Sequence, residues 1–237
     1  MNNLRVFRHE FKYYINYAEY HSLRSRLKHI LKCDKYANEK GEYHIRSLYF
    51  DDVHNSALYE KQSGVLSRKK FRIRIYNISD NVIKLEKKSR IGQFINKTSA
   101  TITKSQYEDI IAEKYDFLKA SDNKLFNELY FHIKASKLKP DVIVDYTREA
   151  YTLPISNIRI TFDKNMKTGL YNTDLFNKNV PTVDVLESPW HVLEIKYDNF
   201  LPDYIRSILQ ISSSQRFAIS KFVICKKFTK NNNWEDN

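Results

Sequence analysis

The chain has 237 residues, of which 42% are hydrophobic, with 17 Tyr, 14 Phe and only 4 Gly and 5 Pro. This composition argues against a disordered or flexible multi-domain chain and is sufficient for one large folded domain. The formal net charge of +12 indicates an anionic partner, such as nucleic acid, a phosphate-rich molecule or a membrane surface.

The predicted elements are mostly strands, interrupted by a few helices. In chain order, we predict a strand at 5–15, a helix from Asn16, strands at 43–51, 68–78, 82–90 and 94–102, a helix from Thr103, a helix at 124–137, strands at 141–151, 157–164 and 190–198, a helix from Pro202, and a strand at 216–226.

Capping residues mark where the helices begin. Asn16 can cap the first helix, and Glu19 follows three residues later, as in a capping box. Thr103 and Gln106 repeat that spacing before the second helix. Pro202 suits the first turn of the last helix. Many strands with few long crossovers predict an α+β fold with a mainly antiparallel sheet, closed into a barrel.

The polar faces of these strands carry charges of both signs. The charged faces include Arg8, Glu10 and Lys12; Lys70, Arg72 and Arg74; Lys84, Glu86 and Lys88; and Glu194 and Lys196. A solvated outer face is the usual meaning of one such strand. The amphipathic helices, however, need an apolar surface, and the apolar strand faces supply it. We therefore expect helices outside, a charged interior, and a bound polyanion that offsets the repulsion between inward cations.

Cysteine usage and the N-terminus exclude several other classes. Cys33 and Cys225 form no CxxC motif, so neither a disulfide framework nor a cysteine-based zinc site is predicted. The chain starts without an apolar signal region, and no run approaches membrane-spanning length. We expect a cytoplasmic protein, and a membrane-protein partner at the inner face of the membrane stays open.

Several fragments of these strands carry a family resemblance. They are Arg8–Tyr13, Ile45–Asp52, Lys70–Arg74, Leu85–Lys88, Tyr146–Arg148, Arg159–Asp163, Leu193–Lys196 and Ser220–Phe222. In this order and spacing the chain resembles a bacterial VTC domain, the polyphosphate-polymerase branch of the CYTH-like triphosphate tunnel metalloenzymes. The resemblance implies one tunnel domain at 1–229, followed by a polar, frayed tail at 230–237.

The resemblance also implies an activity and its ligands. In such a tunnel the γ-phosphate of ATP is transferred to a growing inorganic polyphosphate chain with Mn²⁺ or Mg²⁺. Phosphoryl transfer needs positioning and charge neutralisation more than covalent help, which suits a basic lining. The implied partners are ATP and inorganic polyphosphate, and no nucleic acid is expected, because the aromatic side chains fall mostly opposite the charges.

The site residues implied by the resemblance fall into three sets. The catalytic set is Lys12, Arg72, Arg74, Lys88, Arg148 and Lys221. The substrate-binding set is Lys97, Tyr146, Ser220, Arg46 and Lys196. The metal set is Glu194, with Glu86 and Glu10 as further metal ligands or as internal salt-bridge partners. For Glu194 itself, a salt bridge to Lys196 or to another cation is the alternative to a metal-binding role.

One departure from the superfamily bears on function. Tunnel hydrolases and adenylate cyclases carry Glu-x-Glu-x-Lys on the first strand, whereas this chain has Arg8, Glu10 and Lys12. One carboxylate fewer lowers metal-binding capacity and favours the polymerase branch. A tunnel triphosphatase, a non-catalytic polyphosphate-binding module and a nucleic-acid-binding domain remain as alternatives.

Overall fold

The computed structural model describes residues 8–92, 94–186, 190–210 and 217–231. The chain forms two compact units. Unit 1 consists of Met1–His44, Tyr146–Met166 and Leu186–Ser220; unit 2 consists of Ile45–Asp145, Lys167–Val185 and Lys221–Asn237.

Strands outnumber helices in the part of the chain that the structure describes. The strands are β1 (Arg8–Ile15), β2 (Lys32–Cys33), β3 (Glu42–Asp51), β4 (Ser67–Tyr76), β5 (Ser79–Ile91), β6 (Phe94–Ile102), β7 (Lys139–Leu153), β8 (Ile158–Thr168), β9 (Val183–Asp184) and β10 (His191–Asp198). The helices are α1 (Tyr17–Leu27), α2 (Ser56–Gln62), α3 (Lys104–Ile111), α4 (Asp116–Lys119), α5 (Lys124–Ser136), α6 (Asp203–Ile208) and α7 (Lys221–Asn231), with a 3-10 turn, η1 (Ile155–Asn157).

Hydrogen bonds connect the main strands in the order β1-β10-β8-β7-β3-β4-β5-β6. The short strands β2 and β9 pair with β7 and β8, respectively. Antiparallel pairing joins β1 to β10, β10 to β8, β3 to β4, β4 to β5 and β5 to β6. The α+β fold with an antiparallel sheet that the sequence predicts is therefore confirmed.

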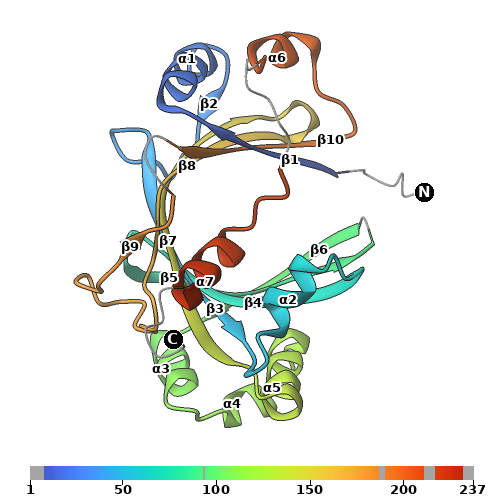
Figure 1. Cartoon of the computed structure of the whole chain (residues 1–237), viewed down its shortest axis with the longest axis vertical. Coiled ribbons are helices and arrows are strands. Elements are labelled where there is room, and N and C mark those ends of the chain that lie inside the picture. Colours follow the sequence, from blue (N-terminus) through green and yellow to red (C-terminus); the bar gives the residue numbers. More distant parts are fainter. Residues whose placement is uncertain (1–7, 93, 187–189, 211–216, 232–237) are drawn as a thin grey trace. The chain divides into compact units, whose positions relative to one another are not determined.

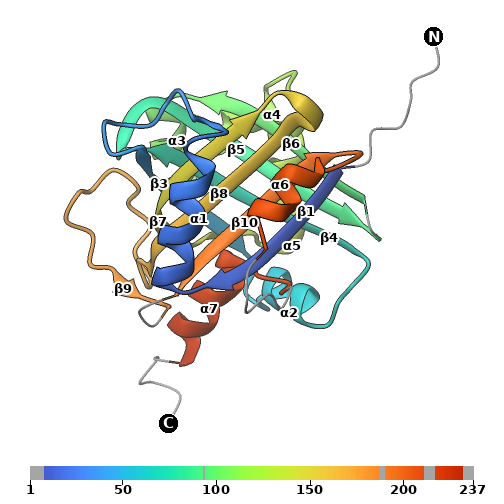
Figure 2. The ribbon, with the colours of Figure 1, turned by 90° about the horizontal axis from the view of Figure 1, so that it is seen from above.

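In unit 1, helices α1 and α6 cover the apolar face of the strands. Helix α1 begins at Tyr17, because the Asn16 side chain accepts a hydrogen bond from the Glu19 amide and the Glu19 carboxylate accepts one from the Asn16 amide. Its buried Leu23 and Leu27 pack in one cluster with apolar residues of β8, β10 and α6. Figure 2 shows α1 and α6 lying over these strands. The charged side chains of these strands consequently lie on the face away from the helices.

In unit 2, helices α3, α4 and α5 cover the apolar face of strands β4 and β5. Helix α3 follows the capping box of Thr103 and Gln106, as predicted. Residues of α3, α4 and α5 share a core with Phe71 and Ile73 of β4 and Leu85 of β5. Figure 1 shows these helices on one side of β4 and β5, with α7 on the other.

The largest differences from the sequence-based prediction lie in the last quarter of the chain. The strand predicted at 216–226 is wrong for its described part, because helix α7 begins at Lys221. Its buried residues recur at helical spacing, at Phe222, Cys225, Lys226 and Thr229, and the short apolar run could not distinguish the two periods. Pro202 is the N-cap of α6 rather than its first residue.

Some short elements were not predicted from the sequence, and some predictions fall on residues that the structure does not describe. Helices α2 and α4 were not predicted, since a helix of one or two turns gives little periodicity. Residues 230–231, where the frayed tail was predicted to begin, are the last two residues of α7. Residues 232–237 of the predicted tail, and residues 5–7 of the first predicted strand, lie outside the described residues. The single domain at 1–229 stays a prediction.

Candidate functional site

Three neighbouring strands of unit 2 place most of their basic side chains on one face. The antiparallel registers of β4 with β5 and of β5 with β6 set rows of directly opposed residues. The rows are Lys70–Lys88–Lys97, Arg72–Glu86–Ser99 and Arg74–Lys84–Thr101. We call these residues the cationic rows. The intervening residues of β4 and β5 face the core, since successive side chains of a strand alternate.

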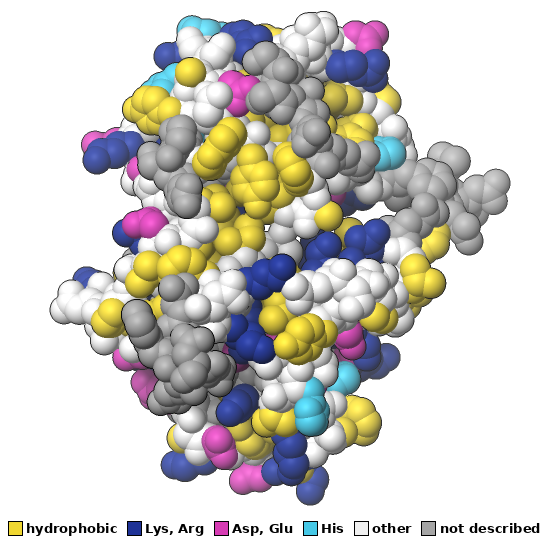
Figure 3. Space-filling view, viewed as in Figure 1, with side chains coloured by type: hydrophobic (Ala, Val, Ile, Leu, Met, Phe, Trp, Pro, Cys, Tyr) yellow, Lys and Arg dark blue, Asp and Glu magenta, His cyan; other side chains and the backbone are white. Residues whose placement is uncertain are grey.

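The first row consists of lysines alone. Directly opposed side chains lie about 5 Å apart at Cβ, and like charges at that spacing destabilise a sheet. Lys97 forms an ion pair with Glu86 of the second row. Figure 3 shows Lys and Arg side chains gathered beside α2 and along β5 and β6. A polyanion bound to this face would relieve the repulsion within the lysine row.

Glu86 is held by cations on both of its oxygens. Arg72 Nη2 lies 2.5 Å from Oε2, and Lys97 contacts Oε1. The Glu86 side chain is 3% exposed, and burial acts to raise its pKa, but Arg72, Arg74 and Lys97 outweigh burial and lower the pKa to about 2. Glu86 therefore has the salt-bridge environment that the sequence left open as an alternative to metal binding.

Strand β3 and helix α7 complete this face. Arg72 donates a hydrogen bond of 2.7 Å to the Tyr49 hydroxyl, and Arg74 donates one of 3.0 Å to the Ser47 hydroxyl. The Phe222 ring of α7 lies 5.2 Å from the Tyr49 ring, with Lys70 Nζ 4.2 Å from the Phe222 ring centre. Helix α7 thus packs against the cationic rows within unit 2.

The Lys70 ammonium and the Tyr49 hydroxyl, both beside α7, have shifted pKa values. Burial, followed by the positive charges of Lys61 and Arg68, lowers the pKa of Lys70 to about 7. Burial acts to raise the pKa of Tyr49, yet Arg72, Arg74 and Lys221 lower it on balance. Lys221, the first residue of α7, therefore contributes to the same positive field.

Unit 1 carries a second group of charges, centred on Glu194 of β10. Glu194 is 4% exposed. Its Oε1 lies 2.7 Å from Lys196 Nζ and 3.7 Å from Lys12 Nζ, and its Oε2 lies 3.7 Å from Arg148 Nη2. Glu10 lies 2.9 Å from the same Lys12 ammonium. We call Glu10, Lys12, Arg148, Glu194 and Lys196 the Glu194 cluster.

The two lysines of this cluster shift in opposite directions. Burial acts to lower the pKa of Lys12, but Glu194 and Glu10 outweigh it and raise the pKa above its usual value. Burial lowers the pKa of Lys196 to about 8, because the attraction of Glu194 and Glu10 does not offset burial and Arg148 adds repulsion. Lys12 is therefore a permanent cation, whereas Lys196 can lose its charge in mildly alkaline solution.

Arg148 is fixed by Asp163, which the sequence-based site set did not include. Arg148 donates hydrogen bonds of 2.6 and 2.8 Å to the two oxygens of Asp163, whose side chain is fully buried. The guanidinium carbon also lies 5.4 Å from the centre of the Tyr146 ring. Two hydrogen bonds in a planar fork set the direction of Arg148.

Glu194 forms the salt bridge to Lys196 that the sequence left open as an alternative to metal binding, and it also lies beside one oxygen donor of the kind that a hard divalent cation prefers. Thr161 lies directly opposite Glu194 in the β10–β8 pairing, and its buried hydroxyl has no hydrogen-bond partner among the described residues. A carboxylate and a hydroxyl offer the oxygen donors that Mg²⁺ or Mn²⁺ prefers, and Mg²⁺ often takes only one or two carboxylates beside phosphate and water. Among those same residues there is no cluster of three His, Cys, Asp or Glu side chains that could enclose a metal alone.

The predicted site residues thus fall into two groups, with one outlier. Unit 1 holds the Glu194 cluster, Tyr146 and Ser220; unit 2 holds Arg72, Arg74, Glu86, Lys88, Lys97 and Lys221. Ser220 follows Ile219, whose carbonyl accepts a hydrogen bond of 3.3 Å from Lys12.

Arg46 is not brought together with either group. It precedes Ser47 on β3 and so points to the other face. There it lies 2.8 Å from Asp145 and donates hydrogen bonds to the carbonyls of Leu175 and Asn177. Through these hydrogen bonds Arg46 holds the loop that contains Leu175 and Asn177 against the sheet of unit 2.

Four side chains that contact or oppose predicted site residues were absent from the sequence-based site set: Ser47, Tyr49, Thr161 and Asp163. Each occupies the charged face of its strand by simple alternation, so the signal was present in the sequence. What was missing was the register, which decides the residue opposite each cation.

A comparison with known protein families supports the resemblance that the sequence carries. The VTC domain family matches residues 7–230. The chain therefore belongs to the VTC domain family. No curated protein matches the chain.

Solved structures show the same fold at low sequence identity. A proposed adenylyl cyclase from Hippeastrum, reported to have a dominant triphosphatase activity, is 12% identical, with a TM-score of 0.51 over 94% of this chain and 96% of that one. A proposed adenylate cyclase from Vibrio parahaemolyticus is 11% identical, with a TM-score of 0.51 over 93% and 98%. No helix within the described residues has the length and apolar character needed to cross a membrane.

Proposed function

We propose that this chain is a metal-dependent phosphotransferase that moves the γ-phosphate of ATP onto inorganic polyphosphate. The observation that carries the proposal is the lysine row Lys70–Lys88–Lys97, beside Arg72 and Arg74, in a chain of the VTC domain family. The opposed cations of this face repel one another, and an anionic ligand with many charges would offset that repulsion.

The residues of the cationic rows would hold and orient phosphate. Arg72 and Arg74 are anchored to β3 by hydrogen bonds to Tyr49 and Ser47, and their planar guanidiniums would grip phosphate oxygens. Lys88 and Lys97 act as point charges along the chain. The attacking terminal phosphate is itself anionic, so the transfer needs charge neutralisation and alignment more than a general base.

The Glu194 cluster would supply the metal site. Glu194 and Thr161 would hold Mn²⁺ or Mg²⁺, which neutralises phosphate charge when bound. Lys12 and Arg148 keep positive charge beside Glu194 at all working pH values, because Glu194, Glu10 and Asp163 raise their pKa values against burial. Arg148 would also orient phosphate, since Asp163 fixes its fork.

A product assay tests the reaction. Purified protein is incubated with ATP and Mn²⁺, and the products are separated by length on a gel. A ladder that grows with time, with ADP released in step, is expected. Glu194→Gln should abolish turnover while keeping most of the phosphate affinity. Full turnover in that variant would remove Glu194 from the metal site.

A matched pair of variants tests the binding face. Lys88 lies in the lysine row, whereas its neighbour Lys87 points to the other face and pairs with Glu128. Lys88→Ala should weaken triphosphate binding about tenfold, and Lys87→Ala should leave it within about twofold. Equal effects would show that net charge, rather than this face, governs binding.

A second candidate function is hydrolysis of a triphosphate. It is favoured by the similar fold of the Hippeastrum protein, which is reported to have a dominant triphosphatase activity. Free phosphate without a ladder in the same assay would support it. Tight binding with intact ATP would instead support a non-catalytic polyphosphate-binding module.

A further inference from the structure

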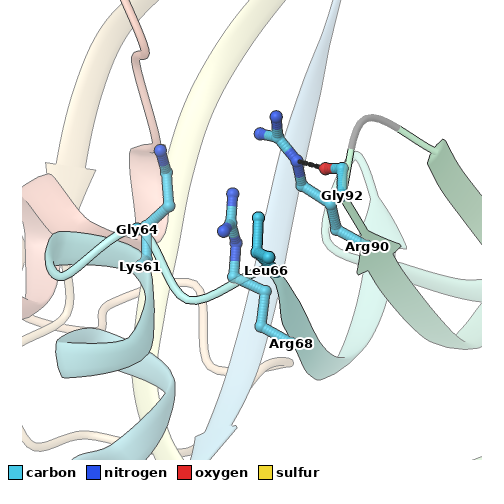
Figure 4. Close-up of a pocket in the computed structure, with 6 residues that line it drawn as sticks. All are labelled: Lys61, Gly64, Leu66, Arg68, Arg90 and Gly92. Carbon is cyan, nitrogen blue, oxygen red and sulfur yellow. Dashed lines mark hydrogen bonds between the residues drawn. The ribbon is translucent and has the colours of Figure 1, made fainter.

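A pocket in unit 2 continues the cationic rows beyond the predicted site. It has a volume of about 180 Å³ and is lined by Lys61, Gly64, Leu66, Arg68, Arg90 and Gly92. Arg68 and Arg90 oppose each other in the β4–β5 pairing, one row beyond Lys70 and Lys88 and on the same face. Figure 4 shows the charged ends of Lys61, Arg68 and Arg90 pointing to the same side.

The backbone holds the two arginines in place. Arg68 Nη1 donates a hydrogen bond of 2.6 Å to the Val65 carbonyl, and Arg90 Nε donates one of 2.7 Å to the Gly92 carbonyl. The Gly92 amide in turn donates to the Leu66 carbonyl at 2.9 Å, which joins the end of β5 to the start of β4. The arginines are therefore positioned before any ligand arrives.

Most of the donor capacity of these arginines is not used within the described part of the chain. Each guanidinium has five N–H groups, and the hydrogen bonds above use one of them. Among the described residues neither Arg68 nor Arg90 lies within ion-pair distance of a carboxylate. A Cβ added at Gly64 or Gly92 would meet no heavy atom within 4 Å, so the space beside them is open.

The electrostatics of the pocket favour an anion. Burial, followed by the charge of Arg90, lowers the pKa of Arg68, while Glu60 acts to raise it. The two guanidiniums therefore repel each other more strongly than Glu60 compensates. A bound phosphate would offset that repulsion and accept the remaining N–H groups in bidentate fashion.

We propose that this pocket binds phosphate units of a long polyphosphate chain whose reacting end is held at Arg72 and Arg74. The inference rests on the proposed function and adds a chain-length preference to it. Along β4, Arg68 lies four positions from Arg72 and six positions from Arg74, which corresponds to roughly 13 and 20 Å. Inorganic triphosphate held at Arg72 and Arg74 ends short of the pocket, whereas a long chain reaches it along the lysine row.

The test compares two ligands on three proteins. Binding of inorganic triphosphate and of long-chain inorganic polyphosphate is measured for the natural chain, for Arg68→Ala/Arg90→Ala and for Lys69→Ala/Lys87→Ala. The control removes two positive charges from the same two strands, but from the opposite face, where both lysines pair with Glu128. The unfolding midpoint of each variant is first compared with that of the natural chain. If Arg68→Ala/Arg90→Ala does not fold, the single variant Arg90→Gln takes its place.

The expected result is selective for chain length. The Arg68/Arg90 variant should bind long polyphosphate about tenfold more weakly and triphosphate within about twofold of the natural chain, and the control should change neither. Unchanged affinity for long chains overturns the inference, as does an equal loss for both ligands. The three proteins are also tested for binding to anionic phospholipid vesicles. If the Arg68/Arg90 variant loses vesicle binding but keeps its affinity for long chains, the pocket binds a lipid headgroup instead and the inference is overturned. A natural chain that binds neither phosphate ligand refutes the proposed function itself.

Discussion

The environment of Glu86 makes the free energy of unfolding depend on pH, and the substitution Glu86→Gln measures that dependence. In the folded protein its pKa is lowered from 4.5 to about 2, despite burial, by Arg72, Arg74 and Lys97. A folded pKa below the unfolded value means that ionised Glu86 stabilises the fold above pH 4.5. That contribution is lost as the pH falls through 4.5 toward 2.

The magnitude follows from the two pKa values. A difference of about 2.5 pKa units at about 1.4 kcal/mol per unit gives roughly 3 kcal/mol at pH 7. At pH 3 the same group contributes roughly 1–2 kcal/mol, because the Glu86 carboxyl is then almost fully protonated in the unfolded chain and mostly ionised in the folded protein. Glutamine has nearly the shape of a protonated glutamate, so Glu86→Gln removes mainly this pH-dependent part.

Urea unfolding at pH 7 and pH 3 measures the effect. Glu86→Gln should lower the free energy of unfolding by roughly 3 kcal/mol at pH 7 and by about half of that or less at pH 3. The control is Glu108→Gln on the exposed side of α3, which should change little at either pH. A loss of equal size at the two pH values would refute the account, because it would show that Glu86 acts by packing rather than by its charge.

Three further predictions concern other parts of the molecule. Asp163→Asn should destabilise the protein by about 3 kcal/mol or more in urea, since it leaves the buried Arg148 without its bidentate partner; Arg148→Met in the same chain should recover part of that loss. Gly169→Ala should lower the unfolding free energy by about 1–3 kcal/mol, because the new Cβ would lie 2.8 Å from Ile143 Cβ; an unchanged midpoint would contradict that contact. Triphosphate affinity should fall as the pH rises from 6 to 8, because Lys70, with a pKa of about 7, loses its charge; Lys70→Arg should flatten this dependence, and a natural chain with a flat profile would count against Lys70 as a ligand-binding cation.

Much of this fold could be predicted because its signals are local. Capping boxes at Asn16–Glu19 and Thr103–Gln106 placed two helices, since the side chain and the amide it accepts from lie within one turn. Alternation along β4 placed Arg72 and Arg74 on one face and Ile73 on the other. The apolar strand faces and the amphipathic helices together predicted that helices cover those faces, as they do in each unit.

Which residues meet across the strands was decided only by the tertiary structure. A period of two assigns a face but no register, and a slip of two residues keeps every side chain on its face while it changes every partner. The opposition of Lys70 to Lys88 depends on the turn between β4 and β5, where Asn77 and Ile78 both have positive φ. The partner of Arg46 lies on a strand 99 residues away, and that of Arg148 on the next strand of the chain, at a register that alternation does not give. The segment Lys221–Asn231 forms a helix whose buried side chains recur at helical spacing.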